Sequence, residues 1–290
     1  MNSAEDDANN TMGVIEVSGT DAASFLRAQL TNDVGRIGPD RHMLAAWCDA
    51  KGRAQAVVRI AQHHDTYLII LPGSLLAPIL KRLQMYVLRA KVDLRDSSDR
   101  FVIAGYLGAE SPAAECTERR GTQLWLGLRG NTGQSARALV LSQIDAETPQ
   151  NSLDVGGDTW RLSQIDAGLP TVVAATQSLF VPQMLNLHWL MAIDFAKGCY
   201  PGQEIIARLH YRGKLTRRLY RFEWAGTLPE AGAAINAADG AAAGTVIMAA
   251  EQTTGQGRLL AVVKTSYARS GLSCEQTNLS LLDLPYPTPD

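Results

Sequence analysis

The sequence has few of the residues that metal sites and disulfide frameworks require. Its 290 residues include only four cysteines and five histidines, and no two cysteines form a CxxC pair. The histidines lack a ligand pattern such as HExxH. So few cysteines would not cross-link a secreted domain of this length. We therefore expect free thiols in a reducing compartment and no metal bound by the isolated protein.

The chain is also poor in long apolar runs and in charge of one sign. No run approaches the roughly 20 apolar residues that cross a bilayer, and residues 1–10 are polar and acidic rather than signal-like. A formal net charge of -2 argues against a protein that coats nucleic acid by bulk charge. These absences predict a cytoplasmic protein with no membrane partner.

What remains is ordinary globular material, with 46% hydrophobic and 19% charged residues. Strands mixed with two helices at the start predict an α+β layer with a mainly antiparallel sheet. Short strands with Gly- and Ala-rich turns near the end predict a small β-barrel. We expect a disordered tail over 1–12, a first α+β domain over 13–99 that is completed by 157–212, a second α+β domain over 100–156, a motif region over 157–212 and a C-terminal barrel domain over 213–290.

The densest motif is residues 197–204, with the sequence KGCYPGQE. Gly198 on one side and the Pro201-Gly202 pair on the other allow sharp bends around Cys199. Good helix formers follow from Gln203. Cys199 is therefore predicted to lie in a turn just before a helix N-terminus.

The surroundings predicted for Cys199 favour a reactive sulfur. A helix N-terminus and the nearby cation of Lys197 both favour the thiolate over the thiol. Glu204 opposes this if it points at the sulfur, or it serves as a proton acceptor. The alternative is a small buried hydrophobic side chain, the commonest role of a free cysteine. That alternative is favoured more strongly for the other three cysteines, Cys48, Cys116 and Cys274.

Residues 197–204 resemble the KGCYxGQE signature of the YgfZ/GcvT-like folate-binding family at every fixed position, which here are Lys197, Gly198, Cys199, Tyr200, Gly202, Gln203 and Glu204. Further stretches are similar to family landmarks: residues 17–34, 48–53, 86–92, 167–170 and 180–187. The similarity runs from about residue 14 to 222 and is weaker between 100 and 155. The resemblance makes a functional role for Cys199 the favoured interpretation.

This resemblance implies a ring of two ferredoxin-like α+β units and a C-terminal β-barrel around a folate site. The expected cofactor is tetrahydrofolate or a one-carbon derivative. Family members support the assembly or repair of iron–sulfur enzymes, including enzymes that modify tRNA. The implied partners are therefore iron–sulfur client enzymes or assembly factors, with an indirect link to tRNA. The family is related to the folate-dependent aminomethyltransferase of the glycine cleavage system, the T-protein.

Three residues are carried over to the folate site. Trp160 matches an aromatic position associated with folate, where an indole offers a flat face to the pterin or aminobenzoyl ring. Asp166 matches an acidic position that accepts hydrogen bonds from the pterin. Arg208 belongs to the signature helix. From chemistry alone, Trp160 also fits the core, and Asp166 also fits a solvent-exposed helix.

The sequence departs from the T-protein at two places. Gln55 and Ala56 stand where the T-protein has a pair of aspartates, one of them catalytic. Without that acid, proton handling during aminomethyl transfer has no evident provider. Met12 stands where a bacterial relative has a second folate-associated tryptophan.

A basic stretch follows the signature and consists of Arg208, His210, Arg212, Lys214, Arg217, Arg218 and Arg221. It fits the glutamate tail of folate, tRNA phosphates or an acidic partner, or simply a solvated face. Three functions therefore stay open. The favoured one is a folate-dependent accessory protein for iron–sulfur enzymes. The others are a folate-dependent aminomethyltransferase or demethylase, and a non-catalytic tRNA- or protein-binding module.

Overall fold

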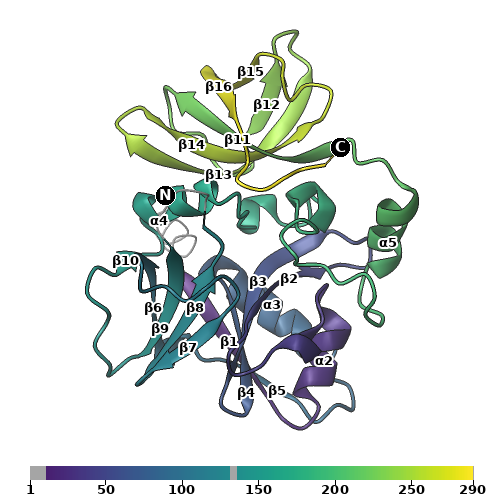
Figure 1. Cartoon of the computed structure of the whole chain (residues 1–290). Coiled ribbons are helices and arrows are strands. Elements are labelled where there is room, and N and C mark those ends of the chain that lie inside the picture. The colour runs from purple at the N-terminus through teal and green to yellow at the C-terminus, as the bar shows by residue number, and fades with distance from the viewer. Residues whose placement is uncertain (1–10, 131–135, 290) are drawn as a thin grey trace.

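The computed structural model describes residues 11–130 and 136–289. Two five-stranded antiparallel sheets lie side by side below a closed six-stranded barrel (Figure 1). Residues 1–10 of the expected tail lie outside the described residues, and the first strand begins at Met12. The α+β class with a C-terminal barrel, expected from the sequence, is confirmed.

The first sheet has the strand order β2-β3-β4-β1-β5. Without edge strand β2, this is the order of a βαββαβ ferredoxin-like unit, with one helix after β1 and one after β4. Its elements are β1 (Met12–Ser18), α2 (Ala22–Gln29), η1 (Val34–Arg36), β2 (Met43–Cys48), β3 (Ala54–His63), β4 (Thr66–Pro72), α3 (Gly73–Gln84) and β5 (Asp93–Asp96).

The second sheet has the order β10-β6-β9-β8-β7. It comprises β6 (Phe101–Leu107), which the short turn η2 (Ser98–Arg100) precedes, β7 (Thr117–Arg120), β8 (Gln123–Leu128), β9 (Arg137–Gln143) and β10 (Leu153–Asp154). Successive side chains of β1 point to opposite faces, so this strand contributes to the cores on both sides of the first sheet. Ile15 faces the core that includes α2 and α3, whereas Val14 faces Leu124 and Leu126 of the second sheet.

The segment between the sheets and the barrel carries little regular structure (Figure 1). It contains α4 (Asp158–Asp166), η3 (Ala174–Thr176), η4 (Pro182–Leu185) and α5 (Gln203–Arg212). Ile165, Leu187 and Ile206 are buried in one core with Trp47 of the first sheet. The signature segment is therefore packed against the first sheet although it follows the second in sequence.

The barrel closes in the order β11-β14-β13-β12-β15-β16. Its strands are β11 (Arg217–Ala225), β12 (Ala234–Ala237), β13 (Ala242–Thr253), β14 (Gln256–Lys264), β15 (Leu272–Cys274) and β16 (Thr277–Leu282). Its interior is filled by side chains that include Phe222, Trp224 and Leu259. Residues 283–289 leave the barrel and return beneath it toward α5 (Figure 1).

Candidate functional site

Cys199 lies exposed on a turn that directly precedes α5. Gly202 is the N-cap of the helix, and its φ of 78° lies in the left-handed region that favours glycine. A Cβ at Gly202 would lie 2.5 Å from the carbonyl oxygen of Asp49 and 2.5 Å from the amide nitrogen of Gly52. Both the backbone conformation and this close approach therefore require glycine at position 202.

The surface that receives Gly202 is the tight turn between β2 and β3. Gly52 has a φ of 70°, and its N–H donates to the Asp49 carbonyl over 2.9 Å. One Asp49 carboxylate oxygen accepts from the N–H groups of Lys51 and Arg53, each over 2.9 Å. The two stretches that resemble family landmarks, 48–53 and 197–204, thus meet backbone to backbone.

Lys197 anchors this turn to the first unit. The side chain is buried, with 5% of its surface exposed. Its ammonium donates to the carbonyl oxygens of Arg27 and Leu30, the latter over 2.7 Å, at the C-terminal end of α2. It also lies 4.5 Å from the centroid of the Tyr200 ring. A cation is favourable at a helix C-terminus, so Lys197 ties the turn to α2.

Burial lowers the pKa of Lys197 to about 8. Electrostatic interactions with Asp33, Asp194 and Cys199 act in the opposite direction and raise this pKa, whereas Arg27 lowers it. The ammonium and the sulfur therefore lie within electrostatic reach of each other. The predicted catalytic role of Lys197 stays a prediction, because the contacts of its ammonium are structural.

The remaining motif residues differ in how tightly they are held. Tyr200 is buried in the core that contains Cys48, and burial raises the pKa of the Tyr200 phenol. The Gln203 amide donates to the Lys197 carbonyl over 3.4 Å. Gly198 is exposed, and a Cβ built there meets no described atom within 4 Å. The bend predicted at Gly198 therefore does not require glycine for steric reasons.

Helix α5 presents Glu204 and Arg208 to solvent. No hydrogen bond or ion pair joins either side chain to another described residue. Ile206 is buried, and the Gln183 amide donates to its carbonyl over 2.6 Å. The neighbouring Ile205 is 41% exposed. The roles predicted for Glu204 and Arg208 stay predictions.

Trp160 is buried in the core between α4 and the second sheet, with 3% of its surface exposed. One ring face lies so close to Gly105 that a Cβ there would be 2.5 Å from the indole Cδ2. The Arg137 guanidinium lies 5.1 Å from the ring centroid. Met12 packs at the edge of the same core. Little of the indole is left for a ligand, so its predicted stacking role stays a prediction.

Asp166 ends α4 and is buried, which differs from a solvent-exposed helix carboxylate. Both of its carboxylate oxygens accept from Arg258 Nη1, over 2.8 and 2.7 Å. Arg221 Nη1 donates to the same carboxylate over 3.3 Å and to the Asp166 carbonyl over 3.1 Å. Asp166 therefore ties α4 to barrel strands β11 and β14.

Asp166 belongs to a larger cluster of charged side chains at the junction of the three units. Composition does not predict this cluster. Arg137 is fully buried and donates to the Ser163 carbonyl over 2.8 Å. The pKa of Arg137 is lowered to about 9, chiefly by burial and also by the charge of Arg59, while Asp166 acts in the opposite direction. Arginines outnumber the carboxylates in this junction cluster, which consists of Arg59, Arg129, Arg137, Arg221, Arg258, Glu115 and Asp166.

Arg59 is the least satisfied member of the junction cluster. Burial lowers its pKa to about 10, Glu115 raises it, and the like charge of Arg129 lowers it. Glu115 is paired instead with Arg129 over 2.8 Å. Within residues 11–130 and 136–289, no hydrogen bond or ion pair engages the Arg59 guanidinium. An unpaired cation in such surroundings suits an anionic ligand.

Known proteins resemble this chain in sequence and in fold. No protein-family model matches the sequence. The tRNA-modifying protein YgfZ of Escherichia coli, in strains O139:H28 and K12 among others, is 32% identical over 235 residues, which cover 74% of this chain and 71% of the relative. The chain belongs to the YgfZ family. The glycine cleavage system aminomethyltransferase T from Bartonella henselae has the same fold, with a TM-score of 0.71 over 96% of this chain and 84% of that one, at 14% identity.

This YgfZ-family chain shares its fold with the aminomethyltransferase, and Gln55 and Ala56 are the residues expected at the positions of the T-protein's aspartate pair. Gln55 is buried with 2% exposed. Its amide donates to the Ser178 hydroxyl over 2.6 Å, and its carbonyl accepts from Arg82 over 3.0 Å. Ala56 is fully buried and apolar. A neutral amide with fixed partners, rather than a free carboxylate, therefore occupies this place.

In this YgfZ-family chain, the basic stretch is split between solvent and the barrel. Arg208, His210, Arg212, Lys214 and Arg217 are exposed, whereas Arg218 and Arg221 are partly buried. His210 stacks on Phe195 with centroids 3.7 Å apart. In the described ranges, no group of three metal-ligating side chains gathers and no helix is long and apolar enough to cross a membrane.

Proposed function

We propose that this chain is a folate-binding accessory protein that supports the assembly or repair of iron–sulfur enzymes, including enzymes that modify tRNA, with Cys199 as its reactive thiol. The observation that carries the proposal is the presentation of Cys199. It is exposed on a turn whose position is set by Gly202 against Gly52 and by Lys197 on α2. A sulfur held at a fixed place and open to solvent is suited to chemistry on another molecule.

The excess positive charge of the junction cluster is complementary to the negative charge of a folate. Folates end in a glutamyl group with two carboxylates, and Arg59 is a guanidinium that needs an anionic partner. Asp166 supplies the carboxylate that can accept hydrogen bonds from N–H groups of a pterin, although Arg258 and Arg221 also hold it. When bound, tetrahydrofolate would supply one-carbon or redox chemistry. The chain itself would supply charge complementarity and orientation.

A role as an aminomethyltransferase is less well supported. Proton transfer at the folate nitrogen and the amine needs a titratable group within hydrogen-bond reach. Gln55 cannot titrate, and its amide and carbonyl are both engaged. The Escherichia coli relatives are named tRNA-modifying proteins, which also favours a role other than glycine cleavage.

The test of the thiol is complementation of a deletion strain of a bacterium that needs its YgfZ-type protein. We expect Cys199→Ser to fail to restore the activities of iron–sulfur enzymes, while Cys116→Ser restores them. Cys116 is the matched control because it is the other exposed cysteine. Full rescue by Cys199→Ser at equal protein levels would falsify the role of the thiol.

The test of the ligand is a calorimetric titration with tetrahydrofolate and 5-formyltetrahydrofolate. We expect Arg59→Met to weaken binding by roughly tenfold or more, since one charge-assisted contact contributes about 1.5–3 kcal/mol. Arg89→Met is the control, because Arg89 is exposed and outside the junction cluster. Equal folate affinities of wild type and Arg59→Met would show that folate does not bind at this junction.

A further inference from the structure

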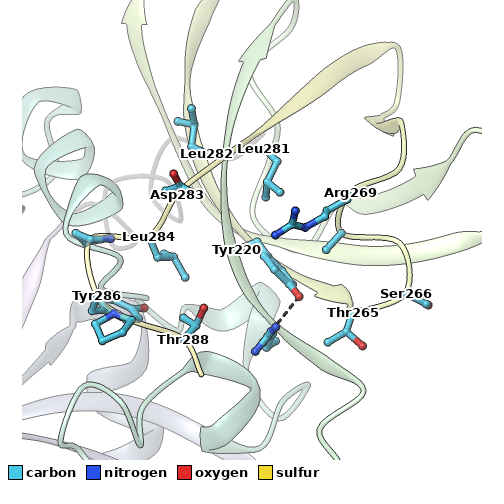
Figure 2. Close-up of a pocket in the computed structure, with 14 residues that line it drawn as sticks. Tyr220, Thr265, Ser266, Arg269, Leu281, Leu282, Asp283, Leu284, Tyr286 and Thr288 are labelled. Carbon is cyan, nitrogen blue, oxygen red and sulfur yellow. Dashed lines mark hydrogen bonds between the residues drawn. The ribbon is translucent and has the colours of Figure 1, made fainter. Parts of the chain in front are cut away.

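The barrel carries a second candidate site that lies apart from Cys199. A cleft of about 930 Å³ opens between the start of β11, the turn at 265–269 and the C-terminal segment 283–288 (Figure 2). Its size is in the range of small-molecule sites, which is roughly 300–1,000 Å³. A bare inorganic anion would leave most of it empty. The cleft therefore suits a ligand with a sizeable body.

One side of the cleft is cationic. Arg269 is exposed, and in Figure 2 its guanidinium points toward Tyr220 across the opening. None of the described residues makes a hydrogen bond or ion pair with it. Arg218 comes from β11 and donates from Nε to the Tyr220 hydroxyl over 3.0 Å. Thr265 and Ser266 line the same side, and the Thr265 hydroxyl donates to the Thr216 carbonyl over 3.5 Å. Guanidinium groups from two elements match the several oxygens of a phosphate.

The floor of the cleft is apolar and aromatic. The Tyr220 ring lies at its centre, with Leu281 above it and Leu284 on the side of the C-terminal segment (Figure 2). Leu281 is 39% exposed, so its side chain adds apolar surface to this floor. A flat aromatic ligand would cover this apolar surface and pack on the Tyr220 ring.

The side opposite Arg269 carries an acid. In the view of Figure 2, Asp283 and Arg269 lie on opposite sides, with Leu281 between them and Tyr220 below. Its carboxylate can accept hydrogen bonds from hydroxyl or amino groups. A cationic end, an aromatic middle and an acceptor end match the phosphate, base and hydroxyl or amino groups of one ligand class. We propose that this cleft binds a nucleoside monophosphate unit, either as a free nucleotide or as the 5′-phosphorylated end of an RNA strand.

The cleft also borders the segment that seals α4. The Tyr286 hydroxyl donates to the Gly168 carbonyl over 2.9 Å and accepts from the Asn186 amide over 3.4 Å. Leu284 and Tyr286 leave no room for a Cβ at Gly168, whose φ is 63°. A ligand in the cleft would therefore rest on the segment that closes over the end of α4, close to Asp166.

The experiment is calorimetry of the full chain with AMP, inorganic phosphate, and a short oligoribonucleotide with or without a 5′-phosphate, at fixed salt. We expect AMP to bind at least tenfold more tightly than phosphate, because only AMP uses the Tyr220 floor. Arg269→Gln should weaken AMP by about tenfold, and Tyr220→Leu should remove the preference for AMP over phosphate. Arg89→Gln, at an exposed arginine outside the cleft, is the matched control. Tighter binding of the phosphorylated oligonucleotide than of AMP would identify an RNA end as the source.

Without folate, three results would overturn the assignment. They are absence of AMP and oligonucleotide binding at millimolar concentration, equal affinities for AMP and phosphate, and an AMP affinity unchanged in Arg269→Gln while its thermal unfolding matches wild type. Each titration is repeated with tetrahydrofolate present. Competition between the two ligands would place AMP in the folate site and also contradict the proposal. If the protein binds AMP but not tetrahydrofolate, the proposed folate function is contradicted and the nucleotide site in the cleft is not.

Discussion

At the scale of single residues, the position of the Cys199 sulfur depends on glycine more than on the side chains beside it. Gly202 and Gly198 flank the same cysteine and look equivalent in the signature. The structure separates them, because Gly202 is pressed against the β2–β3 turn whereas Gly198 faces open space. Identical residue types in one motif thus carry different constraints.

We expect Gly202→Ala to destabilise the fold by about 3 kcal/mol, because the new Cβ would clash with main-chain atoms of Asp49 and Gly52 in a left-handed conformation. Urea unfolding followed by circular dichroism measures the change. Gly198→Ala is the control and should fall within about 0.5 kcal/mol of wild type. Similar losses in the two variants would show that the close approach is not rigid.

The four cysteines should differ sharply in alkylation. Cys199 and Cys116 are exposed, whereas Cys48 and Cys274 are buried, and burial raises the pKa of both buried thiols. Mass spectrometry after brief treatment with iodoacetamide should find label on Cys199 and Cys116 in the native protein. Label on Cys48 should appear only after unfolding. Early labelling of Cys48 would mean that the core around the β2–β3 turn opens readily.

At the scale of elements, the connection of α4 to the barrel depends on Asp166. We expect Asp166→Asn to destabilise the protein by about 3 kcal/mol, because Arg258 and Arg221 would keep their charge at a buried site without the carboxylate. The matched control is Asp158→Asn on the same helix. Asp158 forms an exposed ion pair with Arg161 at an N–O distance of 3.8 Å, and such a pair contributes less than about 1 kcal/mol to stability. Thermal unfolding of both variants measures the difference, and equal shifts would contradict this role of Asp166.

Local patterns predict the start of α5 and the presence of the barrel. The helix expected from Gln203 begins there, and the small β-barrel expected near the end of the chain is observed. Alternation and helix-forming composition are sufficient in such segments. Strands β7, β10, β12 and β15 were not predicted, since each is only two to four residues long.

The site was predictable only in part, because its contacts are distant in sequence. The signature identifies Cys199, but no local pattern shows that Lys197 bonds to the end of α2 or that Gly202 meets Gly52. Nothing in the sequence around Arg59 distinguishes it from other strand arginines, because the nearby Arg129 and Arg137 are distant in the chain. Pairing between units decides these roles, and composition carries no information about it.

At the scale of the whole molecule, acid should weaken the contacts between units. Burial lowers the pKa of His42 to about 3 and those of His63 and His188 to about 4. The unfolded chain, with ordinary histidines near 6.5, therefore binds more protons than the folded chain between about pH 6.5 and 4. Stability is full above that window and falls as the pH drops through it.

For His42 alone the loss is about 1.4 kcal/mol per pH unit below 6.5. His42 joins the first unit to the second through a 2.9 Å contact between its Nε2 and the Gly127 carbonyl. Denaturant unfolding at pH 7.5, 6, 5 and 4.5 measures the slope, which His42→Gln should make shallower. His64→Gln is the control, since His64 is exposed. A free energy of unfolding that increases as the pH falls toward 5 would contradict the predicted direction of the pH dependence.

The glycine contact described above also has a consequence for biosynthesis. The strands that form the receiving turn leave the ribosome well before the segment that docks on it, and joining two such distant parts of a chain is slow. A nascent chain therefore carries Cys199 unanchored until the first unit has formed and captured it. Correct placement of the sulfur thus reports that folding is complete, and an incompletely folded molecule would not present it in the working position.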